Sequence, residues 1–422
     1  MQEHPDKNIN MLLEYLNQAD YYKSIKDYQS AIDCYEKFLK IDNTKASIYT
    51  ITADLYSKLN GSESLKRQIE LYEQAYKLKP DNRLALHGLA FGYEKLGIND
   101  KAKIFYEKLL QTNPTENDYY NYGGFLIHCG DFKTGHKYFT HRFNIDDINL
   151  KYPSDINKKW DLESDISDKV LLVHYEQGFG DTIMYCRFVP FLKKIAKKVI
   201  FVVQKELFDL ISNCEIFEGI EIVTSEANIN YDVNIALLDV VNVLDFESDN
   251  LPFTSKYINI NDDLVDNYKN KFLKNDKTFC IGISCNGEVN ANYKERDVKI
   301  SNIYDIFKNI PNIKLYDLQK NEKSFDDIVP LGKDFVNFTD SACAIKNMDL
   351  IISTDNVILN LAGALGVKTF ALFNKETNYR WFKTQDENVG WYDSVRPIQA
   401  SAQNKWGEVF TKLEENIKEI MQ

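Results

Sequence analysis

The spacing of apolar positions divides the chain into two parts. Over the first 145 residues, small and aromatic side chains return at a regular interval, whereas from residue 169 onwards short apolar runs alternate with amphipathic stretches. The runs KVLLVHY, KVIFVVQ and DVNIALL form one series, and a second series begins with TFCIGIS near residue 278. Apolar strands that alternate with helices predict parallel sheets with right-handed crossovers. We therefore expect a helical part followed by two doubly wound α/β domains.

The interval in the helical part is that of a known repeat. Pro80 and Pro114 lie 34 residues apart. The unit that ends at Pro114 carries small and aromatic residues at fixed positions: Ala90, Tyr93, Gly97, Ala102 and Tyr106. This period is that of tetratricopeptide repeats (TPR), in which small residues stand where paired helices touch and a proline closes the second helix. About four units are predicted, which is enough to bury a stacked core.

Stacked repeats of this kind form a concave groove from their first helices, and such grooves bind extended or helical peptides. In the third unit, four residues are predicted to face this groove: Leu84, His87, Phe91 and Glu94. We therefore expect a protein or peptide partner at these residues.

A polar, charged segment that contains Pro153 separates the two parts, and Trp160 is expected to dock it onto a neighbour. From these changes in composition we predict four regions. They are a TPR array over 1–148, a linker over 149–168, a first Rossmann-like domain over 169–275 and a second one over 276–422.

Composition narrows the classes of function. The 422 residues carry 51 basic and 63 acidic side chains, so the net charge is −12 and a general nucleic-acid role is not expected. No apolar run reaches the roughly 18 residues that would span a bilayer. The N-terminus lacks the order of a signal peptide. The seven cysteines form no C-x-x-C pair, which favours reduced thiols in the cytoplasm over disulfides or a zinc site.

The stretch VHYEQGFGDTIMYCRFVP, residues 173–190, is the first strand-to-helix corner of the first α/β domain. Gly178 and Gly180 allow the backbone to approach a ligand. The run that follows, GDTIMYCRFVPFLKKIA, is predicted to be one helix, which offers free N–H groups at its start. A dinucleotide fingerprint would require glycine where Ile183 stands, and there is no G-K-[ST] of a P-loop. The missing glycine disfavours an oxidoreductase. A dinucleotide-binding fold also needs an acid at the end of its second strand to hold the ribose, and only Glu206 could serve there. A plain turn capped by Asp181 stays open.

Two further corners lie in the second α/β domain. Asp355 and Asn356 follow the run LIIST and open a helix, where Asn356 is either an N-cap or a seat for a diphosphate. The other corner, residues 282–301, is either an anion contact or a solvated charged loop. It carries Ser284, Asn286, Lys294 and Arg296.

Taken in order, these corners resemble bacterial TPR glycosyltransferases related to glycosyltransferase family 9, the ADP-heptose:lipopolysaccharide heptosyltransferase family. The likeness covers roughly residues 130–422. The family motif H-x-E-Q-G-x-G-D-T corresponds here to His174, Glu176, Gln177, Gly178, Gly180, Asp181 and Thr182. The motif D-[ST]-x-x-x-H-x-A-G-A-L-G corresponds to Asp355, Asn356, Asn360, Ala362, Gly363, Ala364, Leu365 and Gly366. A third motif, W-R-W followed by W-Y, corresponds to Tyr379, Arg380, Trp381, Trp391 and Tyr392.

The resemblance implies a TPR solenoid followed by a GT-B fold, with two Rossmann-like doubly wound domains and a cleft between them. It implies a metal-independent, inverting transfer from a nucleotide-diphospho-sugar, without a further cofactor, and the chain contains no Asp-x-Asp. Asp181 would be the base, with Glu176 and His174 in reserve, although His174 is also a typical core histidine. The expected nucleotide-sugar residues are Gln177, Gly178, Gly180, Ser284, Asn286, Lys294, Arg296, Asp355, Asn356, Asn360, Gly363, Arg380 and Trp381.

Alternatives to parts of this interpretation also follow from the sequence. Tyr379, Arg380 and Trp381 could close over the nucleoside or form a packed aromatic loop. Asn356 stands where the family has a small hydroxyl residue, and Asn360 stands where it has histidine. Asparagine keeps hydrogen bonding but supplies neither proton transfer nor positive charge. The alternative function is therefore a catalytically degenerate adaptor that binds peptide or protein partners.

Overall fold

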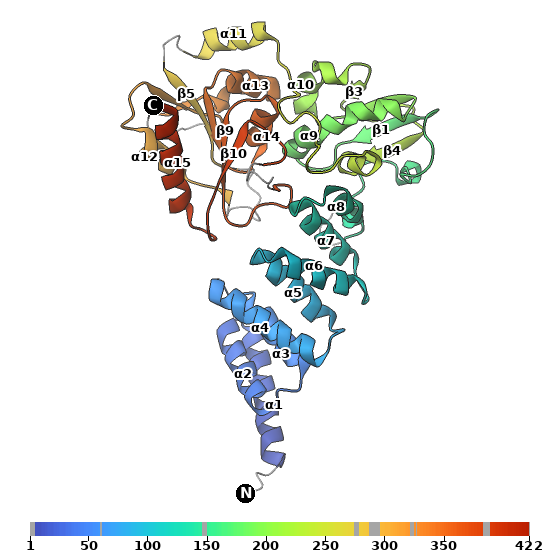
Figure 1. Cartoon of the computed structure of the whole chain (residues 1–422), viewed down its shortest axis with the longest axis vertical. Helices are drawn as coiled ribbons and strands as arrows, with labels where there is room; N and C mark the ends of the chain where they lie inside the picture. Colours follow the sequence, from blue (N-terminus) through green and yellow to red (C-terminus); the bar gives the residue numbers. More distant parts are fainter. Residues whose placement is uncertain are drawn as a thin grey trace. The chain divides into compact units, whose positions relative to one another are not determined.

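The computed structural model describes residues 5–59, 61–145, 150–273, 278–286, 296–320, 325, 327–382 and 389–421 (Figure 1). The chain separates into two compact units, Met1–Phe125 and Leu126–Gln422. The first unit therefore ends inside a helix of the repeat array. The domain boundaries expected after residues 148, 168 and 275 stay predictions.

The first unit is a series of helices that pack on their neighbours in sequence. α1 packs on α2, α3 on α4 and α5 on α6, and α4 also packs on α5. Their bounds are α1 Pro5–Ser24, α2 Tyr28–Ile41, α3 Ala46–Tyr56, α4 Ser62–Leu78, α5 Arg83–Lys95 and α6 Asn99–Leu110. α7, Glu116–His128, follows. Asp27 and Asn82 cap α2 and α5, since their side chains accept from the N–H groups of Ser30 and Ala85.

Small residues lie where these helices touch, as the repeat pattern predicts. Ala90 and Ala102 are fully buried. A Cβ on Gly88 would lie 2.2 Å from the ring of Tyr72, so α5 approaches α4 too closely for any side chain. The helical repeat is therefore confirmed, with glycine and alanine at its contacts.

The second unit begins with the end of α7, then α8 (Phe132–Phe139) and the 3-10 helix η1 (Thr140–Asn144). The connector follows, and Trp160 docks as predicted. Its backbone N–H donates to Asn234 O at 2.9 Å, its indole donates to Ser164 O at 3.0 Å, and its side chain is buried.

The first sheet has four parallel strands in the order β3-β2-β1-β4. The strands are β1 Val170–His174, β2 Lys198–Val202, β3 Glu221–Val223 and β4 Val233–Ala236. The run GDTIMYCRFVPFLKKIA was predicted to be one helix, and this is wrong. It forms α9, Phe179–Tyr185, followed by the 3-10 helix η4, Cys186–Lys194, because Pro190 cannot supply the N–H that a continuous α-helix needs.

The second sheet has six parallel strands in the order β10-β9-β8-β5-β6-β7. The strands are β5 Phe279–Ser284, β6 Ile313–Asp317, β7 Val329–Pro330, β8 Leu350–Ser353, β9 Thr369–Phe373 and β10 Val395–Gln399. Counted within this sheet, the order is 3-2-1-4-5-6, which is that of doubly wound nucleotide-binding folds. In such sheets, ligands bind where the strand order reverses, which here is between β5 and β8.

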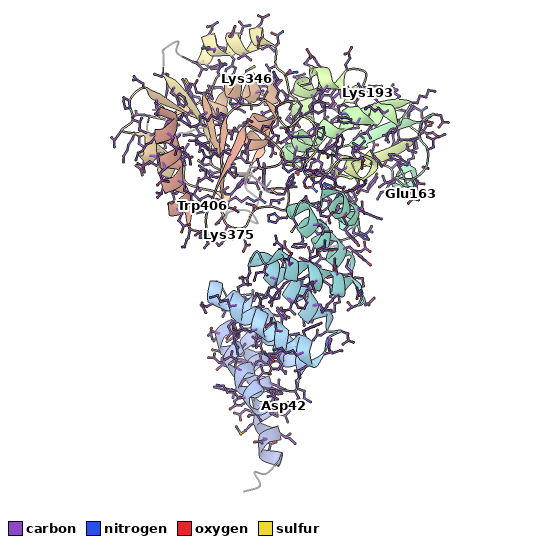
Figure 2. All side chains as sticks on the ribbon, viewed as in Figure 1. Asp42, Glu163, Lys193, Lys346, Lys375 and Trp406 are labelled. Carbon is purple, nitrogen blue, oxygen red and sulfur yellow. The ribbon has the colours of Figure 1, made fainter. Side chains whose placement is uncertain are left out.

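The helices of this part are α11 Asp262–Phe272, α12 Ile300–Phe307, α13 Phe338–Lys346, α14 Val357–Ala364 and α15 Trp406–Met421. α12 and α15 lie side by side on one face of the sheet (Figure 1). Ile303, Leu413 and Ile352 belong to the buried core between them and the strands. Figure 2 shows Trp406 at the start of α15, where its ring lies 6.4 Å from that of Phe410.

The predicted parallel-sheet α/β region is thus confirmed. The runs KVLLVHY, KVIFVVQ, DVNIALL, TFCIGIS and LIIST contain β1, β2, β4, β5 and β8, whereas β3, β7 and β10 lie on none of the predicted runs. Among the described residues, no helix combines the length and the apolar character needed to cross a membrane.

Candidate functional site

A cavity of about 840 Å³ is lined by residues from both sheets of the second unit. It lies at the carboxyl end of β5 and β8, where the order of the second sheet reverses, and it reaches the corner between β1 and α9. Twelve predicted site residues line it: Gln177, Gly178, Gly180, Asp181, Ser284, Asn286, Arg296, Asp355, Asn356, Asn360, Arg380 and Trp381. Glu176, His174 and Gly363 are not among the lining residues, and Lys294 lies outside the described residues.

The corner between β1 and α9 approaches α14 closely. The backbone O of Gly178 accepts from the N–H groups of Asp181 and Thr182, at 3.1 and 3.2 Å, and so begins α9. A Cβ on Gly180 would stand 3.0 Å from the Nδ2 atom of Asn360, which is tighter than an ordinary contact. Glycine at position 180 therefore allows α9 to pack closely on α14 without displacing the amide of Asn360.

Asp181 forms an ion pair with Arg380 inside the cavity. The Nε–Oδ1 distance is 2.5 Å, and the two side chains are only 13% and 16% exposed. Burial raises the pKa of Asp181 above its ordinary value, and nearby Asp355 adds to this rise, whereas Arg380 acts in the opposite direction. A carboxylate in this environment is a better proton acceptor than one at the surface.

Arg380 has further partners at the same corner. Its Nη2 donates to the Oε1 of Gln177 at 2.6 Å, and its Nη1 donates to the Oδ1 of Asn378 at 3.0 Å. Arg380 comes from the segment after β9, whereas Gln177 and Asp181 follow β1. The guanidinium therefore joins the two sheets across the cavity.

Asn356 caps α14 and joins the corner after β8 to the end of β5. Its Oδ1 accepts from the N–H groups of Ile358 and Leu359, at 2.9 and 3.4 Å, and its Nδ2 donates to Ser284 O at 3.2 Å. The next asparagine of the motif is also engaged, because Asn360 donates to Asn356 O at 3.2 Å and accepts from the hydroxyl of Tyr392 at 3.0 Å. Both amides therefore hold the local structure.

The second arginine of the cavity is also paired. The Nη1 of Arg296 lies 2.8 Å from the Oδ2 of Asp355, with 25% and 13% of these side chains exposed. Among the described residues, three cations and four carboxylates line the cavity: Arg296, Lys320 and Arg380, and Asp181, Glu206, Asp297 and Asp355.

The aromatic segment after β9 is packed. Trp381 is 3% exposed, and its ring lies 5.3 Å from that of Phe373, although the residue also lines the cavity. The indole of Trp391 is buried and donates to Arg380 O at 2.6 Å. This agrees with the packed-loop alternative for the aromatic rings and holds the backbone of Arg380 in place.

The two reserve candidates for the base lie elsewhere. Glu176 is buried against Arg142 of η1, which also binds Asp239 at 2.6 Å. Glu176 follows β1 and Asp239 follows β4. Arg142 therefore lies at the carboxyl ends of β1 and β4, the two strands between which the strand order of the first sheet reverses. His174 is buried, its Nε2 lies 3.2 Å from Glu226, and burial lowers its pKa.

Several lining residues were not expected from the sequence. Gln319 and Lys320 lie two and three residues after the end of β6, and Asn337 caps α13. The rule that ligands sit at the carboxyl ends of strands could have pointed to the first two. The rings of Phe179 and Phe338, 4.9 Å apart, also line the cavity, but no motif marks them.

The predicted groove residues of the repeat array share one helix, α5. Leu84 and Phe91 are 51% and 43% exposed. The side chain of His87 is 34% exposed, and its Nδ1 lies 3.2 Å from the Oδ1 of buried Asp118. Glu94 accepts a hydrogen bond from the hydroxyl of Tyr106 at 2.6 Å. The exposed apolar part of the predicted groove is therefore the pair Leu84 and Phe91.

Comparison with known proteins identifies the repeats. The tetratricopeptide repeat family matches residues 15–45, which lie in α1 and α2 and the turns around them. A TPR repeat-containing protein of Methanocaldococcus jannaschii is 32% identical over 114 residues. This match covers 25% of the chain but only 19% of the relative, about a fifth of its length.

Two solved structures are each similar to part of the chain. YrrB, described as a TPR protein with an unusual peptide-binding site, is 20% identical, covers 32% of this chain and 69% of its own, and gives a TM-score of 0.29. A glycosyl transferase family 9 protein from Veillonella parvula is 12% identical, covers 60% of this chain and 92% of its own, and gives a TM-score of 0.43.

Proposed function

We propose that the protein is a glycosyltransferase of the GT-B type that moves a sugar from a nucleotide-diphospho-sugar to an acceptor in the cytoplasm. One observation carries this proposal. The Gly-x-Gly-Asp corner of the first sheet and the Asp-Asn corner of the second sheet line the same cavity, together with Arg296 and Arg380.

The donor would bind on the side of the second sheet. Its diphosphate would lie near the start of α14 and near Arg296 and Arg380, because negative charge develops on the leaving nucleoside diphosphate in the transition state. Preorganised cations in a partly buried cavity stabilise that charge. Since arginine can supply it, the proposed transfer is independent of a metal ion.

Asp181 would act as the base. It would take the proton of an acceptor hydroxyl while that oxygen attacks the anomeric carbon, and the nucleoside diphosphate would leave from the opposite face with the electrons of the broken bond. The configuration at the sugar would therefore invert. Burial of Asp181 supports this role, because a raised pKa strengthens a carboxylate as a proton acceptor.

The acceptor would be a protein or peptide that the repeat array recruits. The exposed side chains of Leu84 and Phe91, seven residues apart on α5, support this part of the proposal. An apolar stripe on the first helix of a repeat suits an extended or helical peptide.

Calorimetric titration with UDP, GDP, ADP and CDP tests the donor site. We expect one of these nucleotides to bind, and we expect R296M to weaken its binding about tenfold or more, because a charge-assisted hydrogen bond contributes roughly 1.5–3 kcal/mol. R396M is the matched control, since Arg396 lies on β10 and is exposed outside the cavity. The acceptor is tested by mass spectrometry of partners from an expressing strain and a deletion strain, and identical glycan masses would contradict a protein acceptor.

A second candidate function is supported by the two asparagines. Because Asn356 and Asn360 are engaged in hydrogen bonds within the protein, the amides that replace the family's hydroxyl and histidine offer no evident phosphate ligand. This favours a degenerate adaptor that binds protein partners through its repeats. No heat with any of the four nucleotides would support the adaptor over the enzyme.

A further inference from the structure

Arg380 lies where the carboxylate of Asp181 and the diphosphate of the proposed donor would compete for its guanidinium. Its guanidinium is held by Asp181 at 2.5 Å and by Gln177 at 2.6 Å, both in the corner after β1. A third partner is Asn378, whose Oδ1 accepts from the Nη1 of Arg380 at 3.0 Å. The side chain is 16% exposed and lines the cavity. Nη1 and Nη2 therefore donate to oxygen atoms of the protein, whereas Nε, which lies beside Asp181, is paired with it by charge and has no hydrogen-bond partner among the described residues.

This pairing conflicts with both roles in the proposed function, Asp181 as the base and Arg380 as a ligand of the diphosphate. Arginine stays protonated at any pH at which the protein is folded, so its pairing depends only on which anion is nearer and better placed. While Arg380 is paired with Asp181, it stabilises the ionised carboxylate and weakens it as a base. Its positive charge then lies against Asp181 instead of against a phosphate.

We propose that Arg380 is a latch. It holds Asp181 until the diphosphate of the donor takes the guanidinium, and donor binding thereby frees the carboxylate that receives the acceptor's proton. The inference rests on the proposed function and adds an order to it, with the donor bound before the acceptor can react. Asp181 is the catalytic residue, and Arg380 passes from that carboxylate to the phosphate.

The second ion pair of the cavity is consistent with such an exchange. Arg296 lies 2.8 Å from Asp355 at the other corner, so both arginines that line the cavity are held by a carboxylate of the protein. A nucleoside diphosphate would have to compete with these carboxylates. Only the exchange at Arg380 releases a base. Asp181 follows β1, on the proposed acceptor side, whereas Asp355 follows β8, on the proposed donor side.

A double-mutant cycle on nucleotide binding tests the latch without requiring turnover. The variants are D181N, R380M and the double variant, and the probe is the tightest of UDP, GDP, ADP and CDP in calorimetry. D181N leaves Arg380 without its competing anion, so we expect the nucleotide to bind about fivefold more tightly than to the wild type. In the R380M background, D181N is expected to change the affinity by less than about twofold.

The cycle separates the latch from simple removal of a negative charge. If Asp181 only repelled the phosphates, D181N would tighten binding equally in both backgrounds, and the latch would be wrong. E206Q is the matched control, because Glu206 is another carboxylate of the cavity, carried by the 3-10 helix after β2. We expect E206Q to change the affinity by less than about twofold with or without Arg380.

The outcomes also separate the latch from the proposed function. If the wild type binds a nucleotide and D181N binds it no more tightly, the latch alone is wrong. If neither the wild type nor D181N binds any of the four nucleotides, the proposed function and the latch both fail. R380Q, which removes the charge but keeps a polar side chain, replaces R380M in the cycle if thermal unfolding shows R380M to be unfolded.

Discussion

Arg142 donates two hydrogen bonds to the carboxylate of Glu176, at Nε–Oε2 and Nη2–Oε1 distances of 2.6 and 2.7 Å, and both side chains are buried. The same guanidinium binds Asp239 at 2.6 Å, and Glu176 also accepts from the backbone N–H of Leu238 at 2.9 Å. One cation from the segment after α8 thus ties together the ends of β1 and β4. Gln177, the next residue after Glu176, accepts a hydrogen bond from Arg380 in the cavity.

Replacing Arg142 is expected to destabilise the second unit severely. R142M would leave Glu176 and Asp239 buried without their counter-charge, and removing one partner of a buried ion pair costs roughly 3–5 kcal/mol. The measurement is thermal and urea unfolding of the full chain. R396M, which removes an exposed arginine, should change stability by about 0.5 kcal/mol or less. Equal stability of R142M and the wild type would mean that Arg142 does not hold this corner.

The two glycines of the first corner are expected to differ in their tolerance of alanine. A Cβ on Gly180 meets the amide of Asn360 at 3.0 Å, and Asn360 is itself held by Asn356 and Tyr392. A Cβ on Gly178 meets only the Oδ2 of Asp181, at 3.6 Å, which is an ordinary contact.

G180A should therefore cost about 1–3 kcal/mol by overpacking α9 against α14. G178A should cost less than about 1 kcal/mol, because its new Cβ contact is an ordinary one. Unfolding curves of the two variants test this directly, and a larger loss for G178A would contradict the packing described here.

Asn356 is expected to matter first as a cap of α14. N356A removes the acceptor for two backbone N–H groups and should cost about 1–2 kcal/mol, whereas N356S and N356D keep a capping oxygen. N356S and N356D differ in charge, so nucleotide binding distinguishes them. N356D should weaken nucleotide binding relative to N356S, because it adds a negative charge beside the proposed diphosphate. Unfolding and calorimetry together test both effects.

A buried histidine of α8 predicts how stability depends on pH. The Nδ1–H of His136 donates to Phe132 O at 2.8 Å, so its Nε2 accepts from the hydroxyl of Tyr185 at 3.0 Å, and the ring is neutral. Burial lowers the pKa of His136 to about 3. In the unfolded chain its pKa returns to roughly 6.5.

The unfolded state therefore binds a proton that the folded state does not. As the pH falls from about 6.5 towards the folded pKa, the free energy of unfolding should fall by up to about 1.4 kcal/mol per pH unit from this residue. The H136Q variant should show a shallower slope over this pH window, even though it is less stable at neutral pH. Parallel slopes for the two proteins would contradict a neutral, buried His136.

The sequence predicted those parts of the structure that local pattern determines. The strands β1, β5 and β8 fall on their apolar runs, since a buried strand needs a continuous apolar segment. Asn356 was recognised as a cap because its side chain acts on N–H groups two and three residues away. The lining of the cavity by both corners followed from the rule for strand ends.

Other features depend on contacts between distant segments and left no local signal. Arg142 and Glu176 are 34 residues apart, and Arg380 and Gln177 are 203 apart. No periodicity marks such a pair, so Glu176 was taken for a reserve base although it is buried. Trp381 was expected either to close over the nucleoside or to lie in a packed aromatic loop, and its burial against Phe373 could be known only from the folded chain.

A crystal structure of the full chain with a bound nucleoside diphosphate would show directly whether the cavity of the second unit is the donor site. We expect the diphosphate to lie in this 840 Å³ cavity, beside Asn356 and within hydrogen-bonding distance of Arg296 and Arg380. A nucleotide bound elsewhere on the protein, with Arg296 and Arg380 still paired to Asp355 and Asp181, would contradict it.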